Sequence, residues 1–183
     1  MRAGSRGWPL AVVLALLALE GLLKRWAVAN LTPGVDRTLL PGVLHLDFTL
    51  NPGMAWGMLG SFTAPLAILR LLVGLVIVAA LLSGRLGRAQ RWPLALIAAG
   101  ALGNALDGLT RGAVVDYLTS PLLDAVSGTL GGGRFPIFNL SDVLVCAGVA
   151  GLLLHAGWRE RQARHDGPPA PESRAPTHTE ENP

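Results

Sequence analysis

Charged residues are scarce in this chain. Of its 183 residues, 15% are Asp, Glu, Lys or Arg and 51% are apolar, and the mean hydropathy is +0.46. Soluble domains carry about 25% charged residues, so this chain has too little polar surface for an ordinary soluble fold. The composition therefore predicts an integral membrane protein with room for one domain.

Cysteine is nearly absent, and so is a concentrated patch of charge. Cys146 is the only cysteine, which excludes an intrachain disulfide and CxxC redox chemistry, and we interpret it as a packing residue. The formal charge of +3 comes from scattered arginines. Because no basic patch is interleaved with aromatic residues, we expect no nucleic acid as a partner and lipid as the anionic neighbour.

The motifs of metal-dependent and serine hydrolases are missing too. The chain contains neither HExxH nor GxSxG, the patterns that those mechanisms use. His155 stands alone in the last apolar stretch, and we expect it at the opposite end of that helix from the acidic residues. We therefore expect no metal and no cofactor.

Four apolar stretches are long enough to cross a bilayer, which takes about 20 residues of helix. They cover roughly residues 8–29, 65–83, 92–109 and 138–158. The first resembles a cleavable signal sequence, but Glu20, Lys24 and Arg25 stand between its apolar core and the A-x-A pattern, which favours a retained helix. The sequence thus predicts an all-α membrane protein with four transmembrane helices in a single membrane-embedded domain, residues 1–165.

The arginines predict the orientation of these helices. The N-terminal segment, the loop 84–91 and the segment after Trp158 are basic, whereas connections 30–64 and 110–137 hold three arginines between them. Since basic loops stay inside, we expect both termini in the cytoplasm and the two longer connections outside. Residues 166–183, rich in Pro, Glu, Ser and Thr, are predicted to form a disordered cytoplasmic tail.

One regular element is expected in the first outer connection. LHLDFTLN, residues 44–51, alternates strictly between apolar and polar residues, as half-buried strands do. Pro52 and Gly53 then turn the chain. An isolated hairpin is marginally stable, so we expect a small extracytoplasmic β-sheet that leans on the helices, with its apolar face toward the membrane or a substrate.

Polar side chains gather at one face of the predicted bilayer. Ionisable residues in a span cost a few kcal/mol and mark functional sites. Asn104 and Asp107 share a face near the end of the third helix. Asn139 and Asp142 share a face at the start of the fourth. Asp116 lies just beyond the third helix, so the topology brings all five residues to the outer interface.

Each acid also has a structural interpretation. Asp107 precedes Arg111 by four residues, the spacing of a helical ion pair. Asp142 falls in a first helical turn, where an acid serves capping. For Asp116 the structural alternative is an exposed loop acid. Two carboxylates that share one proton can, however, polarise a water molecule and a carbonyl together, so the pattern indicates aspartic peptidase chemistry.

Four blocks of the chain closely resemble, in order, those of the lipoprotein signal peptidases, the type II signal peptidases of bacterial membranes. They are EGLLK at 20–24, NPGMAW at 51–56, GNALDGLTRGAVVDYL at 103–118 and FNLSD at 138–142. The resemblance implies removal of the signal peptide from prolipoproteins at the outer face of the bacterial cytoplasmic membrane, before a cysteine that carries diacylglycerol. The implied partners are these prolipoproteins and membrane lipids, and we expect a monomer.

The same resemblance implies roles for single residues. Asp116 and Asp142 occupy the positions of the catalytic aspartates. The positions implied to support the site or contact the substrate are Asn51, Asn104, Asp107, Asn139, Glu20 and Lys24. Two positions depart from the family pattern: Glu20 replaces an aspartate, and Gly108 stands where arginine usually follows GNxxD. We hypothesise that Arg111 takes over the pairing role of that arginine.

Two other functions are compatible with apolar helices. In a small proton-coupled transporter the acids would relay protons, but they would be distributed through the bilayer rather than gathered at one face. A noncatalytic scaffold explains the helices and leaves the paired acids unexplained. In the peptidase interpretation, Asp116 lies in apolar surroundings and is the expected holder of the shared proton.

Overall fold

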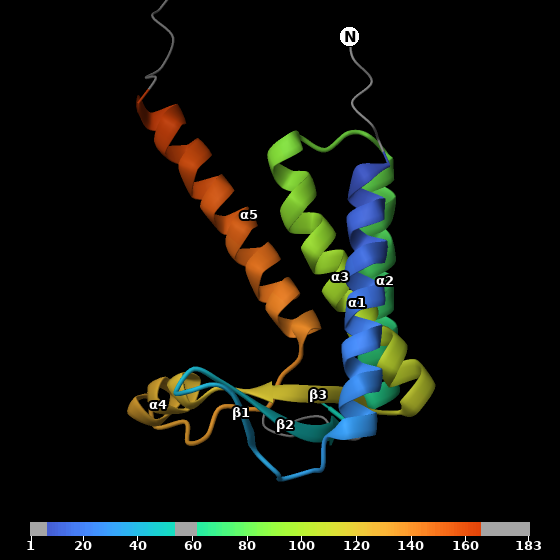
Figure 1. The fold of residues 1–183 in the computed structure, drawn as a ribbon. Helices are drawn as coiled ribbons and strands as arrows, with labels where there is room; N and C mark the ends of the chain where they lie inside the picture. Colours follow the sequence, from blue (N-terminus) through green and yellow to red (C-terminus); the bar gives the residue numbers. More distant parts are fainter. Residues whose placement is uncertain (1–6, 54–61, 166–183) are drawn as a thin grey trace, which may run out of the picture.

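The computed structural model describes residues 7–53 and 62–165. In chain order its elements are α1 (Trp8–Asn30), β1 (Arg37–Leu40), β2 (Leu44–Asn51), α2 (Thr63–Leu82), α3 (Arg88–Arg111), β3 (Val114–Thr119), α4 (Pro121–Thr129) and α5 (Leu140–His165). The sheet and α4 lie together at one end of the four long helices (Figure 1). The predicted tail 166–183, the arginines before residue 7 and positions 54–56 of the NPGMAW block lie outside the described residues.

All four predicted spans correspond to helices. Of the described helices, α2, α3 and α5 are long and apolar enough to cross a membrane. The first helix, α1, has 23 residues but contains three charged ones, Glu20, Lys24 and Arg25. Glu20 and Lys24 are buried inside the protein, so α1 directs these two charges toward the neighbouring elements.

Two of these helices are longer than their apolar stretches. The third begins four residues earlier than predicted, at Arg88, where the Gln90 side chain accepts a hydrogen bond from the Gly87 N–H at 3.1 Å. The last begins at Leu140 and runs on to His165 through a polar segment with an Arg164–Glu160 ion pair of 2.6 Å. Hydropathy detects only the apolar part of a helix, whereas capping and i,i+4 pairs extend it.

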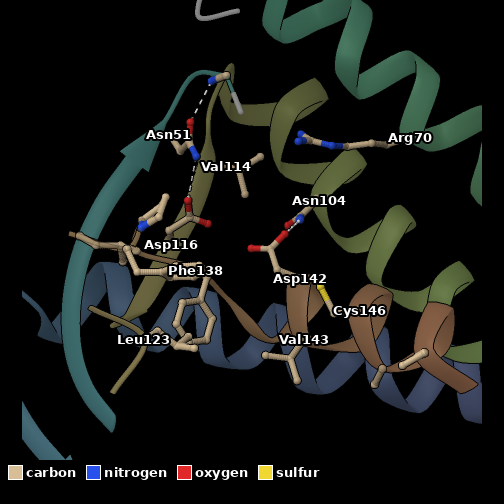
Figure 2. A pocket seen from close by; sticks show the side chains of 16 residues that line it. Asn51, Arg70, Asn104, Val114, Asp116, Leu123, Phe138, Asp142, Val143 and Cys146 are labelled. Atoms are coloured by element: carbon tan, nitrogen blue, oxygen red, sulfur yellow. Dashed lines mark hydrogen bonds between the residues drawn. The ribbon is translucent and has the colours of Figure 1, made fainter. Parts of the chain in front are cut away.

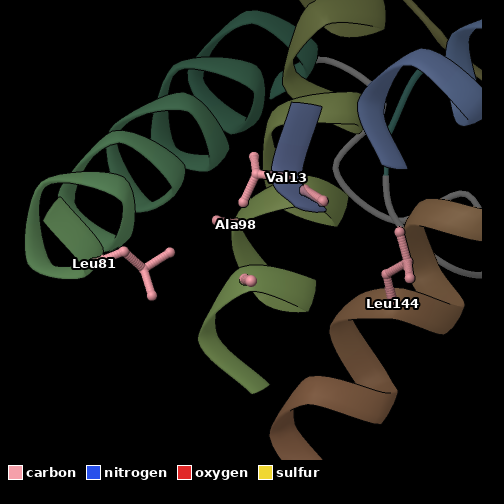
Figure 3. Packing of buried hydrophobic residues seen from close by; sticks show 6 residues of the cluster. Val13, Leu81, Ala98 and Leu144 are labelled. Atoms are coloured by element: carbon pink, nitrogen blue, oxygen red, sulfur yellow. The ribbon is translucent and has the colours of Figure 1, made fainter. Parts of the chain in front are cut away.

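The helix α3 is the centre of the bundle and packs against α1, α2 and α5. Its buried residues are mostly small, with alanines such as Ala95, Ala98 and Ala99 almost inaccessible. A Cβ on Gly100 would lie 2.3 Å from the backbone oxygen of Ser141 in α5. Small residues allow helices to approach this closely, and Figure 3 shows side chains of α1, α2 and α5 gathered around α3.

The predicted strand is confirmed with its bounds, Leu44–Asn51, and it forms the middle of a three-stranded antiparallel sheet in the order β1-β2-β3. The prediction that its apolar side chains all share one face is wrong. The strand has an extra residue between Leu46, which pairs with Leu118, and Thr49, which pairs with Asp116. Such a bulge reverses the facing of the residues beyond it. Leu50 is therefore on the face opposite to Leu46 and is 53% exposed.

The sheet leans on the end of α1. Ala27 and Leu31 at that end form a buried cluster with Val115 and Tyr117 of β3. Neither β1, β3 nor α4 is apparent from the sequence pattern. The short helix α4 is nevertheless locally encoded, because the Ser120 hydroxyl accepts a hydrogen bond from the Leu123 N–H at 3.3 Å and a proline follows the cap.

Candidate active site

Asp116 lies in the middle of β3 and is 2% exposed. Its Oδ2 accepts a hydrogen bond from Asn51 Nδ2 at 3.0 Å, and its Oδ1 accepts one from Asn139 Nδ2 at 2.7 Å. The neighbouring Val115 and Tyr117 are buried as well. The alternative of an exposed loop acid is therefore wrong: Asp116 is a buried acid fixed by two amides, and Figure 2 shows the hydrogen bond from Asn51.

Asp142 stands in the first turn of α5 and takes part in a reciprocal cap. Its backbone N–H donates to Asn139 Oδ1 at 3.0 Å, and its Oδ2 accepts from the Asn139 N–H at 3.2 Å. Its Oδ1 accepts from Asn104 Nδ2 at 2.9 Å. The predicted capping role of Asp142 is thus present. Asp142 also lines a cavity together with Asp116, so capping is not its only possible role.

Asn139 joins the two acids. It is 0% exposed, and its side chain donates to Asp116 while it accepts from the backbone of Asp142. The preceding residue, Phe138, exchanges backbone hydrogen bonds with Leu118 at 2.8 Å each way. This bridge binds the start of α5 to β3, which is why acids 26 positions apart in the sequence reach one site.

The electrostatic surroundings of Asp116 favour its neutral form. Burial, reinforced by the negative charge of Asp142, raises the pKa of Asp116 to about 7. The hydrogen bonds from Asn51 and Asn139 lower that pKa and only partly offset the effect. An acid with a pKa near neutrality can keep its proton at physiological pH, in line with the proton assignment made from the sequence.

A second group of polar residues lies behind the two acids and is centred on Lys24. The Lys24 ammonium is 3.3 Å from Glu20 Oε1 and 2.9 Å from Asp107 Oδ2, and it donates to Asn104 Oδ1 at 2.9 Å. Asp107 also pairs with Arg111 Nε at 3.3 Å. The i,i+4 pair expected from the sequence is thus present, and the three N–H donors of Lys24 all have acceptors.

Glu20 and Asp107 tie the helices to the strand that carries Asp116. Asp107 Oδ2 accepts from the Val115 N–H at 3.0 Å. Glu20 Oε2 accepts from the Tyr117 hydroxyl at 2.7 Å, and Glu20 Oε1 accepts from the Ser141 N–H at 3.3 Å. Burial raises the pKa of Tyr117 well above its usual value, which preserves this hydroxyl as a donor.

Tyr117 is a site residue that was not predicted from the sequence. The sequence contains a feature that could have identified this residue: Tyr117 is the only tyrosine of the chain and directly follows Asp116. Phenolic hydroxyls usually have a partner when buried, so a single tyrosine in an apolar segment predicts a buried acceptor. That acceptor, Glu20, is 97 positions away, and no local pattern identifies it.

The two acids face a cavity of about 640 Å³. Asn51, Arg70, Asn104 and the two acids supply its polar lining (Figure 2). The apolar lining comes from α4, the segment before α5 and one side of α5 itself: Leu123, Phe135, Pro136, Ile137, Phe138, Val143, Ala147 and Ala150. A cavity with one polar side suits an apolar ligand that presents a single polar group for reaction.

Cys146 also lines this cavity and is exposed. The interpretation as a packing residue is therefore wrong. An apolar run in the sequence does not reveal which side of a helix meets protein, and Cys146 follows Asp142 by one helical turn, on the side of α5 that faces the cavity.

The position that departs from the family pattern, Gly108, is a close contact between helices. A Cβ there would lie 2.7 Å from the Cβ of Ala67 in α2. Ala67 is itself 0% exposed. An arginine cannot occupy position 108 unless these two helices move apart, so the local packing explains the glycine.

Comparison with known proteins agrees with this arrangement. Residues 12–158 match the family model described as Signal peptidase (SPase) II. The chain belongs to the signal peptidase II family. The family assigned from four sequence blocks is thus confirmed. Membership in a peptidase family indicates that the chain is an enzyme. It does not favour the two alternative functions, a proton-coupled transporter and a noncatalytic scaffold.

Relatives in this family are similar over most of their length. The lipoprotein signal peptidase of Deinococcus radiodurans is 44% identical over 166 residues, which cover 89% of this chain and 86% of that protein. The lipoprotein signal peptidase of Synechococcus sp. (strain RCC307) is 37% identical over 158 residues, 84% of this chain and 97% of that protein. A solved bacterial membrane enzyme shares the fold, with a TM-score of 0.72 at 20% identity over 93% of this chain and 95% of the other.

Proposed function

We propose that this protein is an aspartic endopeptidase that removes the signal peptide from prolipoproteins, before a diacylglyceryl-modified cysteine. One observation carries the proposal: Asp116 and Asp142 come from different elements, are joined through Asn139 and face the same cavity. The family model and the lipoprotein signal peptidases among the relatives support this activity.

The dyad works with one proton. Asp116 holds it, as its raised pKa of about 7 favours, and Asp142 is the base. Asp142 takes a proton from a water molecule, the water oxygen bonds to the scissile carbonyl carbon, and Asp116 protonates the carbonyl oxygen. When the tetrahedral intermediate collapses, the C–N bond breaks and the proton from Asp142 passes to the leaving amine. The carboxyl product returns its proton to Asp116, which restores the dyad.

The supporting residues act on the dyad through their hydrogen bonds. Asn51 and Asn139 hold the Asp116 carboxyl, and Asn104 holds Asp142. Lys24 orients Asn104 by donating to its Oδ1, so that the amide N–H points at the acid. Preorganised donors of this kind keep the reacting groups in one geometry before the substrate arrives.

We place the protein in the bacterial cytoplasmic membrane as a single, monomeric domain of residues 1–165 with four spans. Glu20 and Lys24 of α1 are buried and paired, which lowers the cost of their charges in a span. The basic segment 84–91, which covers most of the connection between α2 and α3 and the first turn of α3, lies at the end of these helices remote from the sheet (Figure 1). The positive-inside tendency then puts both termini in the cytoplasm and the dyad at the outer face.

A direct assay tests this function. The protein reconstituted in lipid is incubated with a prolipoprotein that carries the diacylglyceryl cysteine, and a shorter product is expected. Asp116→Asn and Asp142→Asn should each abolish that product, whereas Arg37→Gln, at an exposed position of β1, should keep it. A product that persists in both aspartate variants would contradict the proposal.

A further inference from the structure

Arg70 is an isolated charge in the most apolar of the three candidate spans. No other ionisable residue occurs in α2. A charge inside a span costs a few kcal/mol and usually marks a functional position. Within the described part of the chain, the Arg70 guanidinium makes no hydrogen bond and no ion pair, so the fold itself makes no visible use of its donors.

Close contacts between α2 and α3 fix the depth of Arg70. A Cβ on Gly108 would meet Ala67 at 2.7 Å, and a Cβ on Gly74 would meet the Leu102 side chain at 2.6 Å. Position 67 thus lies opposite 108, and position 74 opposite 102, so the two helices run antiparallel here. Arg70 falls between these contacts and lies level with the turn of α3 between them.

That turn of α3 contains Asn104, which donates to Asp142. Arg70 lines the cavity together with both of these residues and with Asp116. Figure 2 shows the Arg70 side chain extending from α2 toward the space beside Asn104 and Asp142. The guanidinium is therefore at the depth of the two acids, on the α2 side of the cavity.

The other cations close to the site already have partners. Lys24 contacts three acceptors, and Arg111 pairs with Asp107. Arg70 has only an electrostatic attraction to Asp142. A guanidinium offers five N–H donors and no acceptor, so a ligand of Arg70 must present oxygen acceptors within the cavity.

The neighbours of Arg70 indicate which oxygens these are. Leu69, Leu72 and Val73 are 56%, 54% and 42% exposed, and in a spanning helix such a surface meets lipid. Arg70 therefore lies where lipid-facing α2 borders the cavity, whereas the Asn51 amide is already engaged with Asp116. In the substrate, ester carbonyls are the polar groups between the acyl chains and the cysteine, and burying them without a donor is costly.

We propose that Arg70 binds the ester carbonyl oxygens of the diacylglyceryl group on the substrate cysteine. The inference rests on the proposed function and deepens it, because it assigns the lipid-recognising group of the same site. The close packing at Gly108 contributes to this role. Because Gly108 has no side chain, α2 approaches α3 closely enough for Arg70 to line the cavity.

The test compares two lipid-modified precursors that differ only in the linkage of their chains, one diacylglyceryl (ester) and one dialkylglyceryl (ether). The enzyme is reconstituted in bilayers of dialkyl phospholipid, so that the substrate is the only source of ester carbonyls. We expect the unaltered enzyme to have about tenfold higher kcat/KM for the ester substrate, since hydrogen bonds to charged groups contribute on this scale. Arg70→Gln should lose this preference, Arg70→Lys should keep part of it, and Arg37→Gln should keep all of it.

Three results would overturn the inference. The first is an unaltered enzyme that cleaves both substrates equally well. The second is an Arg70→Gln variant that retains the ester preference. The third is a variant that loses activity equally on both substrates with a shifted pH profile, which would mean that Arg70 acts through Asp142. An unaltered enzyme that cleaves neither precursor would instead refute the proposed function, and the inference with it.

Discussion

Two groups of buried acids lie side by side in this protein and differ in their partners. In the Lys24-centred cluster, Glu20 and Asp107 share the lysine, and Asp107 also contacts Arg111. In the dyad, the acids accept hydrogen bonds from side-chain amides and backbone N–H groups alone, as far as the described residues 7–53 and 62–165 are concerned. Acids balanced by a cation hold elements together, whereas acids held by neutral donors can still exchange protons with a substrate.

Asn104 connects the two groups, because it accepts from Lys24 and donates to Asp142. The structural cluster therefore orients a donor of the dyad, and Lys24 acts on Asp116 only at a distance, through a charge that lowers the pKa of that acid without a direct contact. This separation allows one buried region to contain both a rigid scaffold and a titratable site. The comparison predicts that damage to the dyad abolishes activity while the fold survives, and that damage to the cluster affects the fold first.

The largest expected effect is on catalysis. Asp116→Asn should reduce cleavage by about a thousandfold or more and leave the protein folded. Between the ordinary pKa of 3.8 and the raised value of about 7, the folded protein binds more protons at Asp116 than the unfolded chain. Stability is therefore lost as the pH rises through this window. The variant lacks this loss, so its unfolding temperature at pH 8 should equal or exceed that of the unaltered protein, and a marked decrease would contradict the comparison.

The next effect is on stability. Lys24→Met would leave the buried carboxylates of Glu20 and Asp107 without their shared cation, and removing one partner of a buried ion pair costs about 3–5 kcal/mol. Unfolding of the protein in detergent measures the loss. Arg25→Met, a change at the exposed neighbour, is the control and should have little effect. Equal stability of the two variants would show that the cluster does not support the fold.

A smaller loss of stability is expected at the α2–α3 contact. Gly108→Ala places a Cβ 2.7 Å from that of Ala67 and should destabilise the protein by about 1–3 kcal/mol. Gly21→Ala in α1 meets no atom within 4 Å and should be neutral or slightly stabilising, because alanine favours helices. If both variants unfold at the same temperature, the contact does not limit side-chain size at position 108.

The pH dependence of cleavage tests whether Asp116 of the dyad is the acid that titrates. Activity should fall as the pH rises above about 7, because Asp116 then loses the proton that the reaction needs. The hydrogen bond from Asn51 lowers this pKa, so Asn51→Ala should move the fall in kcat/KM to higher pH, besides lowering its maximum. An Asn51 variant whose profile does not move would show that another group controls it.

The smallest effect is expected at the edge of the cluster. Arg111 is 39% exposed in its side chain, and pairs of this kind contribute about 0.2–1 kcal/mol. Arg111→Ala should therefore lower stability by up to about 1 kcal/mol, measured by the same unfolding experiment, with the pH profile unchanged. Full retention of stability and activity would refute the hypothesis that Arg111 takes over a pairing role.

Local patterns were sufficient for the four long helices and for β2. Apolar runs of about 20 residues and a strict two-residue alternation are visible in any short window of the sequence. The strand around Asp116 was not visible in this way, because its VVDYLT segment is almost entirely buried and shows no alternation. Its pairing with β2 and its contact with the end of α1 decide its conformation, and both partners are distant in sequence.

Composition, spacing and four motif blocks are properties of the chain alone, and they were sufficient to identify a membrane protein and its family and to predict the two acids that we propose as the dyad. The tertiary structure decided how the acids divide into a cation-paired cluster and an amide-held dyad. It also decided that Arg70 lies level with Asn104. The reason is physical: these relations depend on contacts between residues that are distant in the sequence, up to 80 positions for Lys24 with Asn104 and 97 for Glu20 with Tyr117, and such contacts form only when the helices pack.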